Sequence, residues 1–424
     1  MIRRPFFSLG RPRLKFPVVQ KSSPIDIPLP SKVTLFFEAV PADTKDPAVS
    51  LGDKVKTGQK LKITENDEDY FISTVSGTIC DISEYTGYLG RDYTSISIET
   101  LANDEWDDAF AAGKDPTLKV GREFLGCLPG APDFASLLDF KTPVNTLIIY
   151  GLDKDLLVTT NQFIVETEVE ALAKGIELLK NITHTDEVIM VVPPHLLKKA
   201  GETGADVRKI RPSYPNTLPG MIVKKVLGRE ISPGKNPVEM GVGIISAEAV
   251  VALSHAFDRG EIPVEKILTI IKKDGATVLA RARIGTPLKD VLETLNIQTA
   301  HGDRLVLGGP MTGTTAYSED LPVLPDTDAV MIQDRKDITP SSDTQCINCG
   351  ECIRACPANV PINMLVRLLE NGLYEEAVSE YDLLSCIECG LCSYVCPAMI
   401  PVFQYIMLGK FEYARIISVE EPNG

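Results

Sequence analysis

In the first quarter of the chain, apolar residues occur in short runs that polar residues interrupt. From residue 27 to about residue 100, brief apolar runs are separated by turn residues, among them Gly52-Asp53 and Ser76-Gly77. Runs of this length bounded by glycine and aspartate are typical of strands in a small β domain. The pattern therefore predicts a first domain over residues 27–100.

The pattern of apolar and polar residues changes in the next segment, where the apolar runs are longer and do not alternate with polar residues. Residues 146–150 and 187–192 are continuously apolar or nearly so, and residues 240–246 form a similar stretch. Unbroken runs indicate parallel strands that are covered on both faces, and the helical spacing of apolar residues between the first two predicts a βαβ unit. We expect a Rossmann-like α/β domain over residues 110–260.

A compact α+β unit follows at residues 262–313. It combines two strand-like stretches with a helix that begins at Thr286-Pro287, a capping residue followed by a proline suited to the first helical position. This order of elements predicts a β-grasp module. The Asp- and Pro-rich residues 321–340 are then expected to form a linker to the last domain.

Eight of the ten cysteines lie in the last domain, residues 341–424, where we also expect helices at 362–369 and 375–381. They form two runs of identical spacing, C-x2-C-x2-C-x3-C-P, namely Cys346, Cys349, Cys352, Cys356 and Cys386, Cys389, Cys392, Cys396. This is the spacing of two-cluster ferredoxins, in which the fourth cysteine of each run binds the other cluster. Structural zinc sites use paired units from separate segments, and disulfides are unexpected in a long chain that shows no secretory signal.

The crossed pattern gives two predicted metal sites. The first 4Fe–4S cluster is expected on Cys346, Cys349, Cys352 and Cys396, and the second on Cys386, Cys389, Cys392 and Cys356. The other two cysteines carry no such expectation. Cys80 is predicted to be a small buried apolar residue, and Cys127 an unreactive thiol.

Charge limits the partners. The chain has 424 residues and a net charge of −15, which argues against nucleic acid as a partner. No segment approaches the apolar length that spans a bilayer, so any membrane role should be peripheral.

Residues 1–26 are the exception to the negative charge of the chain, because six cations precede the first acid, Asp26. This basic extended arm is either solvated or draped on a neighbour, or it docks to a membrane partner or acidic lipid.

Two resemblances refine these expectations. Residues 27–100 resemble the barrel-sandwich module of biotinyl and lipoyl carriers, but the corresponding turn at 65–69 is acidic and lacks the lysine that those carriers modify. The whole chain resembles the RnfC family of the Rnf electron-transport complex, a layout that some cobalamin reductases share. The matching segments are Pro28-Leu29-Pro30, residues 52–59, Leu227-Gly228-Arg229-Glu230, Ile284-Gly285-Thr286-Pro287, residues 308–313, and Cys386-Ile387-Glu388-Cys389-Gly390 through Tyr394-Val395-Cys396-Pro397.

The resemblance implies a peripheral subunit at the cytoplasmic face of the cell membrane. Such a subunit belongs to an ion-translocating oxidoreductase complex, works with other subunits, and receives electrons from ferredoxin directly or through a partner subunit. A mainly structural adaptor, whose clusters stabilise a docking domain, is the alternative of a different class.

One region departs from the family. Related subunits have a GGAGFPT loop for FMN phosphate, whereas the loop around Gly130, residues 127–134, reads CLPGAPDF. Its prolines remove amide donors, and Asp133 adds a negative charge where a phosphate would lie. Residues 152–155 and 214–220 depart from the family as well. We expect a scaffold that holds no FMN and does not use NADH; the alternative is an FMN-containing NADH dehydrogenase or cobalamin reductase subunit.

Overall fold

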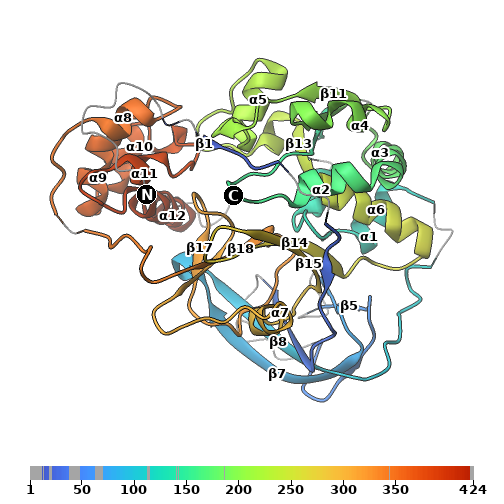
Figure 1. Ribbon diagram of the computed structural model, residues 1–424. Helices are drawn as coiled ribbons and strands as arrows, with labels where there is room; N and C mark the ends of the chain where they lie inside the picture. The colour runs from blue at the N-terminus through green and yellow to red at the C-terminus, as the bar shows by residue number, and fades with distance from the viewer. Residues whose placement is uncertain are drawn as a thin grey trace.

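The computed structural model describes residues 12, 14–18, 22–37, 48–62, 70–111, 115–139, 141, 143–185, 187–342 and 344–420. Most of the basic arm and the acidic turn at 65–69 lie outside the described residues. Figure 1 shows a mixed sheet in the middle of the molecule, the N-terminal strands on one side of it, an α/β domain on the other, and a helical C-terminal domain beside both.

The N-terminal domain is an antiparallel β structure, as its short apolar runs predict. Its main sheet has the order β3-β8-β7-β4, and β5 pairs with β6. The strands are β3 (Lys32–Phe37), β4 (Lys54–Val55), β5 (Lys60–Leu61), β6 (Phe71–Ile72), β7 (Gly77–Thr86) and β8 (Asp92–Thr100). Val33, Ile96 and Ile98 are fully buried between these strands because alternate residues of each strand face inward.

Cys80 corrects one expectation. It lies in β7 but is exposed, and its Sγ contacts the carbonyl oxygen of Ser97 at 3.4 Å. The pairing of β7 with β8 shifts register between Ile79 and Asp81. Gly77 and Ile79 are the buried residues of this part of β7, so the alternation of side chains already turns Cys80 outward, and the prediction of a buried Cys80 is wrong.

The α/β domain contains a four-stranded parallel sheet of order β11-β10-β9-β13. The strands are β9 (Thr146–Tyr150), β10 (Glu187–Val192), β11 (Asp206–Lys209) and β13 (Val242–Ser246). The helices are α1 (Leu118–Phe124), α2 (Thr160–Thr167), α3 (Val169–Thr183), α4 (Leu197–Gly201), α5 (Pro219–Leu227) and α6 (Ala247–Arg259). Leu147 and Ile149 pack with the buried residues of α3 and α6, whereas Ile148 and Tyr150 pack with those of α5. The apolar strands are therefore covered on both faces.

The mixed sheet has the order β17-β16-β18-β14-β15-β2 and packs against α7 (Leu288–Thr294). Its strands are β2 (Ile25–Asp26), β14 (Glu265–Ile271), β15 (Thr277–Arg283), β16 (Arg304–Leu307), β17 (Thr314–Ala316) and β18 (Ala329–Gln333). β18 pairs with both β14 and β16, and its Val330 and Ile332 are buried. The predicted linker at 321–340 is therefore wrong in its centre, because an apolar strand there completes the sheet.

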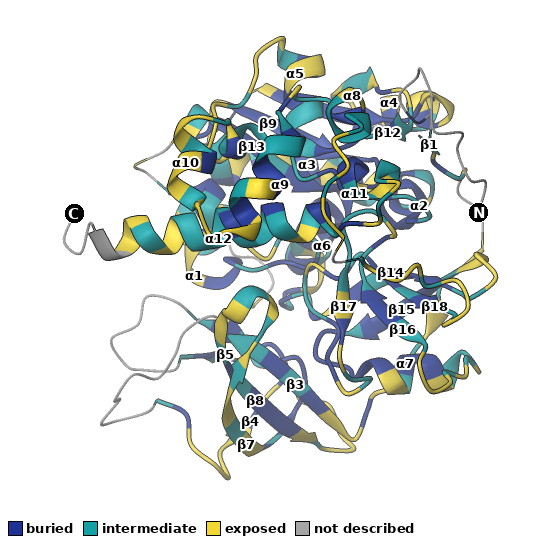
Figure 2. Cartoon of the chain, turned by 90° about the vertical axis from the view of Figure 1, so that its left-hand side faces the viewer, coloured by how far each residue is buried: buried dark blue, intermediate teal, exposed yellow. Residues whose placement is uncertain are grey.

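The C-terminal domain is helical. It contains α8 (Glu351–Ala355), α9 (Ile362–Glu370), α10 (Tyr374–Ser379), α11 (Leu391–Val395) and α12 (Val402–Glu420). The helices predicted at 362–369 and 375–381 correspond to α9 and α10. Leu365, Leu383 and Ile406 form the fully buried centre of this domain. In Figure 2 the end of α12 extends away from the body with mostly exposed residues.

The described part of the basic arm lies on the protein itself. β1 (Leu14–Lys15) pairs antiparallel with β12 (Ser213–Tyr214), and β2 (Ile25–Asp26) pairs parallel with β15. Phe16 is buried in a cluster with Tyr214 and Leu391. Residues 14–16 thus bridge the α/β domain and the cysteine-rich domain.

Candidate metal centres and the loop beside them

Both cysteine runs have the same local conformation. After the second cysteine of each run, a glycine adopts a positive φ, 75° at Gly350 and 66° at Gly390, and a short helix follows it. The left-handed conformation costs glycine little, so the chain turns sharply there and places the third cysteine in the first helical turn. Each helix ends at the fourth cysteine, Cys356 or Cys396, which is extended and precedes a proline.

The first predicted set of sulfurs lies around one cavity. Cys346, Cys349, Cys352 and Cys396 all line it, together with Asn363 and Val366 of α9 and Val402 at the start of α12. The fourth cysteine comes from the second run, as the crossed pattern requires. Four cysteines around one space form the ligand set of a 4Fe–4S cluster.

The members of the second predicted set are also close to one another. The pKa of Cys389 responds to Cys386 and Cys356, and that of Cys392 responds to Cys386 and Cys389. Cys356, Cys389 and Cys392 are buried, whereas every cysteine of the first set is half-buried. The second set is therefore the more enclosed of the two.

Burial keeps these thiols protonated in the absence of metal. It raises the pKa of Cys352 and of Cys389 to about 12, and that of Cys392 well above its ordinary value. Thiolates bind metals, so a bound metal centre must compensate for the removal of these protons. Within the described ranges, no three His, Cys, Asp or Glu side chains are placed to hold a single metal ion. The sulfurs of the first set surround a space and fit a cluster whose irons each bind one cysteine.

Two residues outside the runs hold the second run in place. Lys410 of α12 donates to the carbonyl oxygen of Cys386 and to Oε1 of Glu388, both at 2.7 Å. The buried Tyr214 hydroxyl donates to the carbonyl oxygen of Cys389 at 2.6 Å. Sequence reasoning missed both roles, because nothing in the local pattern around Lys410 or Tyr214 indicates a contact with a cysteine loop.

The loop around Gly130 is packed into the fold. The amide of Gly130 donates to Pro325 O at 2.7 Å, and the amides of Leu128 and Ala131 donate to each other's carbonyl oxygens, both at 2.9 Å. Pro129 and Pro132 have no amide hydrogen to donate. These donors are consequently satisfied within the protein and do not converge on a common ligand.

The same loop covers the beginning of α6. A Cβ atom added at Gly130 would lie 2.4 Å from Ser246 Oγ, so the backbone of the loop approaches the N-cap of the helix closely. Ser246 Oγ in turn accepts from the amide of Ala249 at 3.0 Å. The helix end that would attract a phosphate in a nucleotide-binding fold is thus capped and covered.

Two further side chains of this region, Cys127 and Asp155, have structural surroundings. Burial raises the pKa of Cys127 to about 12, with Asp326 and Asp133 adding to the rise, which agrees with the expectation of an unreactive thiol. Asp155 accepts from the amides of Met311 and Thr312 at 3.1 and 2.7 Å and so ties residues 308–313 to the α/β domain.

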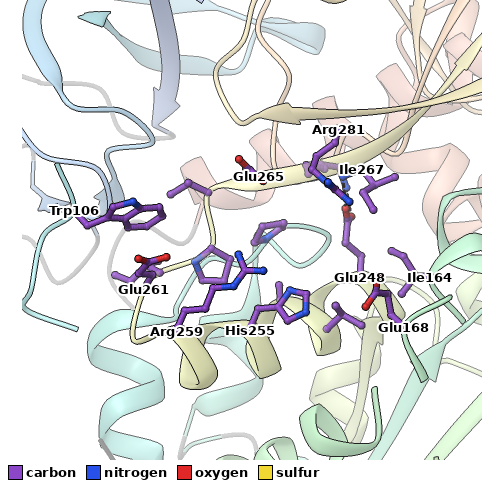
Figure 3. A pocket seen from close by; sticks show the side chains of 17 residues that line it. Trp106, Ile164, Glu168, Glu248, His255, Arg259, Glu261, Glu265, Ile267 and Arg281 are labelled. Carbon is purple, nitrogen blue, oxygen red and sulfur yellow. Dashed lines mark hydrogen bonds and ion pairs between the residues drawn. The ribbon is translucent and has the colours of Figure 1, made fainter. Parts of the chain in front are cut away.

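A separate cavity of about 470 Å³ lies between α6 and β14 (Figure 3). Arg259 and His255 of α6 face it from one side and Arg281 of β15 from another, while Trp106 closes one end. Carboxylates, including Glu261, also line it. Because charges of both signs surround this space, its lining does not select one class of ligand.

Comparisons with known proteins agree with both ends of this architecture. A family model described as the RnfC barrel sandwich hybrid domain matches residues 18–103, and a model of a 4Fe-4S dicluster domain matches residues 340–397. The RnfC-type component of the proton-translocating ferredoxin:NAD(+) oxidoreductase complex of Clostridium ljungdahlii is 27 % identical over 390 residues, which cover 86 % of this chain and 84 % of that protein. The chain is homologous to such RnfC-type proteins over most of its length. The resemblance to RnfC-type proteins, the barrel-sandwich domain and the 4Fe–4S domain, all predicted from the sequence, are thereby confirmed.

Other relatives of this chain are longer. The corresponding component of the ion-translocating oxidoreductase complex is 26 % identical in Pectobacterium carotovorum and 25 % identical in Serratia proteamaculans, over 79 % and 78 % of this chain. The chain spans about half the length of these two relatives, 48 % and 50 %. Among solved structures, an NAD+-reducing NiFe hydrogenase in its H2-reduced state has a TM-score of 0.47 and 14 % identity, covering 73 % of this chain and 68 % of that one.

In the part of the chain that the structure describes, none of the helices has the length and apolarity that a membrane crossing requires.

Proposed function

We propose that this chain is a peripheral electron-transfer subunit of a membrane-bound, Rnf-type ion-translocating oxidoreductase complex, at the cytoplasmic face of the membrane. In this role it relays electrons through two 4Fe–4S clusters, between a ferredoxin-fed partner and another redox subunit. The observation that supports the proposal best is the cavity lined by Cys346, Cys349, Cys352 and Cys396, since it joins residues of both runs in the crossed arrangement.

The residues of the chain have distinct roles in this proposal. The first cluster is assigned to the half-buried set at that cavity, and the second to Cys386, Cys389, Cys392 and Cys356. Bound clusters of this kind supply one-electron carriers. The half-exposed first set is then the one closer to a partner protein, and the buried second set faces Tyr214 and the α/β domain.

NADH is not part of the proposed relay. The satisfied amides around Gly130 and the covered start of α6 provide no converging donors for a flavin phosphate. One observation favours the second candidate, an FMN-containing NADH dehydrogenase or cobalamin reductase subunit. The C. ljungdahlii relative belongs to a complex whose name includes NAD(+) as the acceptor.

The cluster content tests the proposal. Anaerobically purified protein should contain about eight iron and about eight acid-labile sulfide per chain, the sum of two 4Fe–4S clusters. Cys396→Ser should perturb the spectrum of the first cluster and Cys356→Ser that of the second, each leaving the other signal in place. Zinc in place of iron, or one signal lost in both variants, would contradict the crossed assignment.

A further inference from the structure

Each cysteine run has an ion pair whose cation also donates to a carbonyl oxygen of the ligand loop. The less exposed partner is the cation in one pair and the anion in the other. At the second run, Lys410 donates to Cys386 O and pairs with Glu388 at 2.7 Å. At the first run, Arg354 donates to Cys349 O at 3.1 Å and pairs with Glu351. The two pairs thus occupy comparable places beside the two ligand loops.

The exposed fractions differ between the pairs. The Lys410 side chain is 18 % exposed and its partner Glu388 is 43 % exposed. At the other run the order is reversed, because Arg354 is 53 % exposed and Glu351 only 15 %. Water screens an exposed charge more than a buried one, so the less exposed member of each pair dominates the local field. That member is a cation at the second run and an anion at the first.

A cation beside an iron–sulfur cluster stabilises the reduced form, which carries one more negative charge. Net charge, hydrogen bonds and solvent exposure are the properties through which a protein adjusts the potential of such a cluster. The second run has the buried cation, a backbone amide of Glu388 that lies 3.4 Å from Cys386 Sγ, and three buried cysteines. The cation and the amide both favour added negative charge at this run, whereas burial disfavours the more charged, reduced form, so the cation has to outweigh that cost.

We propose that Lys410 is a positioning residue that raises the reduction potential of the second cluster and so favours an electron resting there rather than on the first cluster. The inference rests on the proposed function, because it requires a cluster on each run. It adds a direction to the relay: electrons that enter at the half-exposed first set move toward the enclosed second set.

The test is a redox titration of the purified full chain, monitored by EPR. The two signals are assigned beforehand with Cys396→Ser and Cys356→Ser. Lys410→Gln keeps an amide donor for Cys386 O but removes the charge. We expect it to weaken reduction of the second cluster about tenfold, which corresponds to about 59 mV for one electron. Lys410→Arg should restore most of the potential, and neither variant should move the first cluster.

Two further variants separate charge from structure. Glu388→Gln removes the opposing carboxylate and should raise the potential of the second cluster, whereas Arg354→Gln should change only the first. An unchanged second potential in Lys410→Gln with full iron content would overturn the inference. If Lys410→Gln loses iron, Glu388→Gln decides, and the absence of a rise refutes the proposal. Wild-type protein without two clusters would instead refute the proposed function itself.

Discussion

Asp153 is the residue whose charge the fold disfavours most clearly. It is 1 % exposed and accepts from the amide of Asn161 and from Gln162 Nε2 at 2.9 and 2.8 Å. Burial raises its pKa to about 7, and Asp328 adds to the rise. The folded state therefore holds a proton that the unfolded state has already released above the ordinary pKa of 3.8. Stability contributed by this group should fall as the pH rises from about 4 to about 7.

Replacing Asp153 with asparagine should remove this pH dependence. Gln162 Oε1 is buried without a hydrogen-bond partner among the described residues, so a rotated Gln162 amide can accept from the new side chain. We expect Asp153→Asn to raise the free energy of unfolding at pH 8 by roughly 2–4 kcal/mol and by less than half as much at pH 5. Denaturant titrations at both pH values measure the difference. Equal changes at the two values would show that ionisation of Asp153 is not the cause.

The cysteine ligands were predictable from the sequence, but the residues that hold the cysteine loops in place were not. The spacing of the cysteines predicts which sulfurs lie close together, because the loop and the short helix after Gly350 or Gly390 are local structures. Tyr214 and Lys410 reach the second run from 175 and 24 residues away, through packing that no local pattern records. The exposed Cys80 was missed for another reason, since the buried face of β7 carries Gly77 and Ile79 and the residue next to Ile79 points outward.

Among the elements, the short strand β1 has the clearest structural role. It pairs with β12 and places Phe16 against Leu391 and Cys389 of the second cysteine run. Phe16 is 9 % exposed, whereas Val18, two residues on, is 66 % exposed. The described part of the arm thus holds the cysteine-rich domain against the α/β domain.

Phe16→Ala should therefore destabilise the contact between these two domains. Removing a buried aromatic ring costs about 3–5 kcal/mol in a core, and a smaller loss of about 2–3 kcal/mol is expected at this edge position. Thermal unfolding and the rate of iron loss to a chelator both report it. Val18→Ala is the matched control on the same segment and should behave as wild type. If Phe16→Ala weakens only assembly with partner subunits and leaves the isolated chain unchanged, the arm is a docking element.

Strands were predicted where the apolar run itself indicates a strand, and one was missed where only its pairing with distant strands shows it. β9 and β10 are apolar after their first residues, Thr146 and Glu187, and both were expected. β18 carries an equally apolar run, but aspartates and prolines around it favoured a linker, and only its pairing with β14 and β16 shows that it is a central strand. The elements of the mixed sheet are thus distributed from β2 to β18, a sequence separation that local patterns do not reveal.

The whole molecule should associate with a membrane through other subunits. None of the helices in the described residues is long and apolar enough to cross a bilayer, and the net charge of −15 disfavours anionic lipid as the main partner. We expect the chain to co-purify with integral membrane subunits and to be released from membranes by a chaotropic or high-pH wash. Recovery only with detergent, in cells that lack those subunits, would contradict this prediction.

The absence of flavin is the whole-molecule prediction that separates the two candidate functions. Phosphate binding needs several converging amides and little negative charge, but the amides of Leu128, Gly130 and Ala131 are satisfied within the protein and Asp133 adds a carboxylate. We expect less than stoichiometric FMN after acid extraction of the purified chain, and no NADH oxidation with artificial acceptors. About one FMN per chain would restore the NADH-dehydrogenase alternative.

A loop exchange extends this test to the surroundings of the loop. Replacing residues 127–134 with a GGAGFPT-type loop should not restore flavin binding, because more than the loop has changed. Asp155 holds Met311 and Thr312 through its carboxylate, and Tyr214 is engaged with Cys389. These groups would still occupy structural contacts in the exchanged protein. If the new loop alone recovered stoichiometric FMN, residues 127–134 would be the only part of the flavin site that this chain has lost.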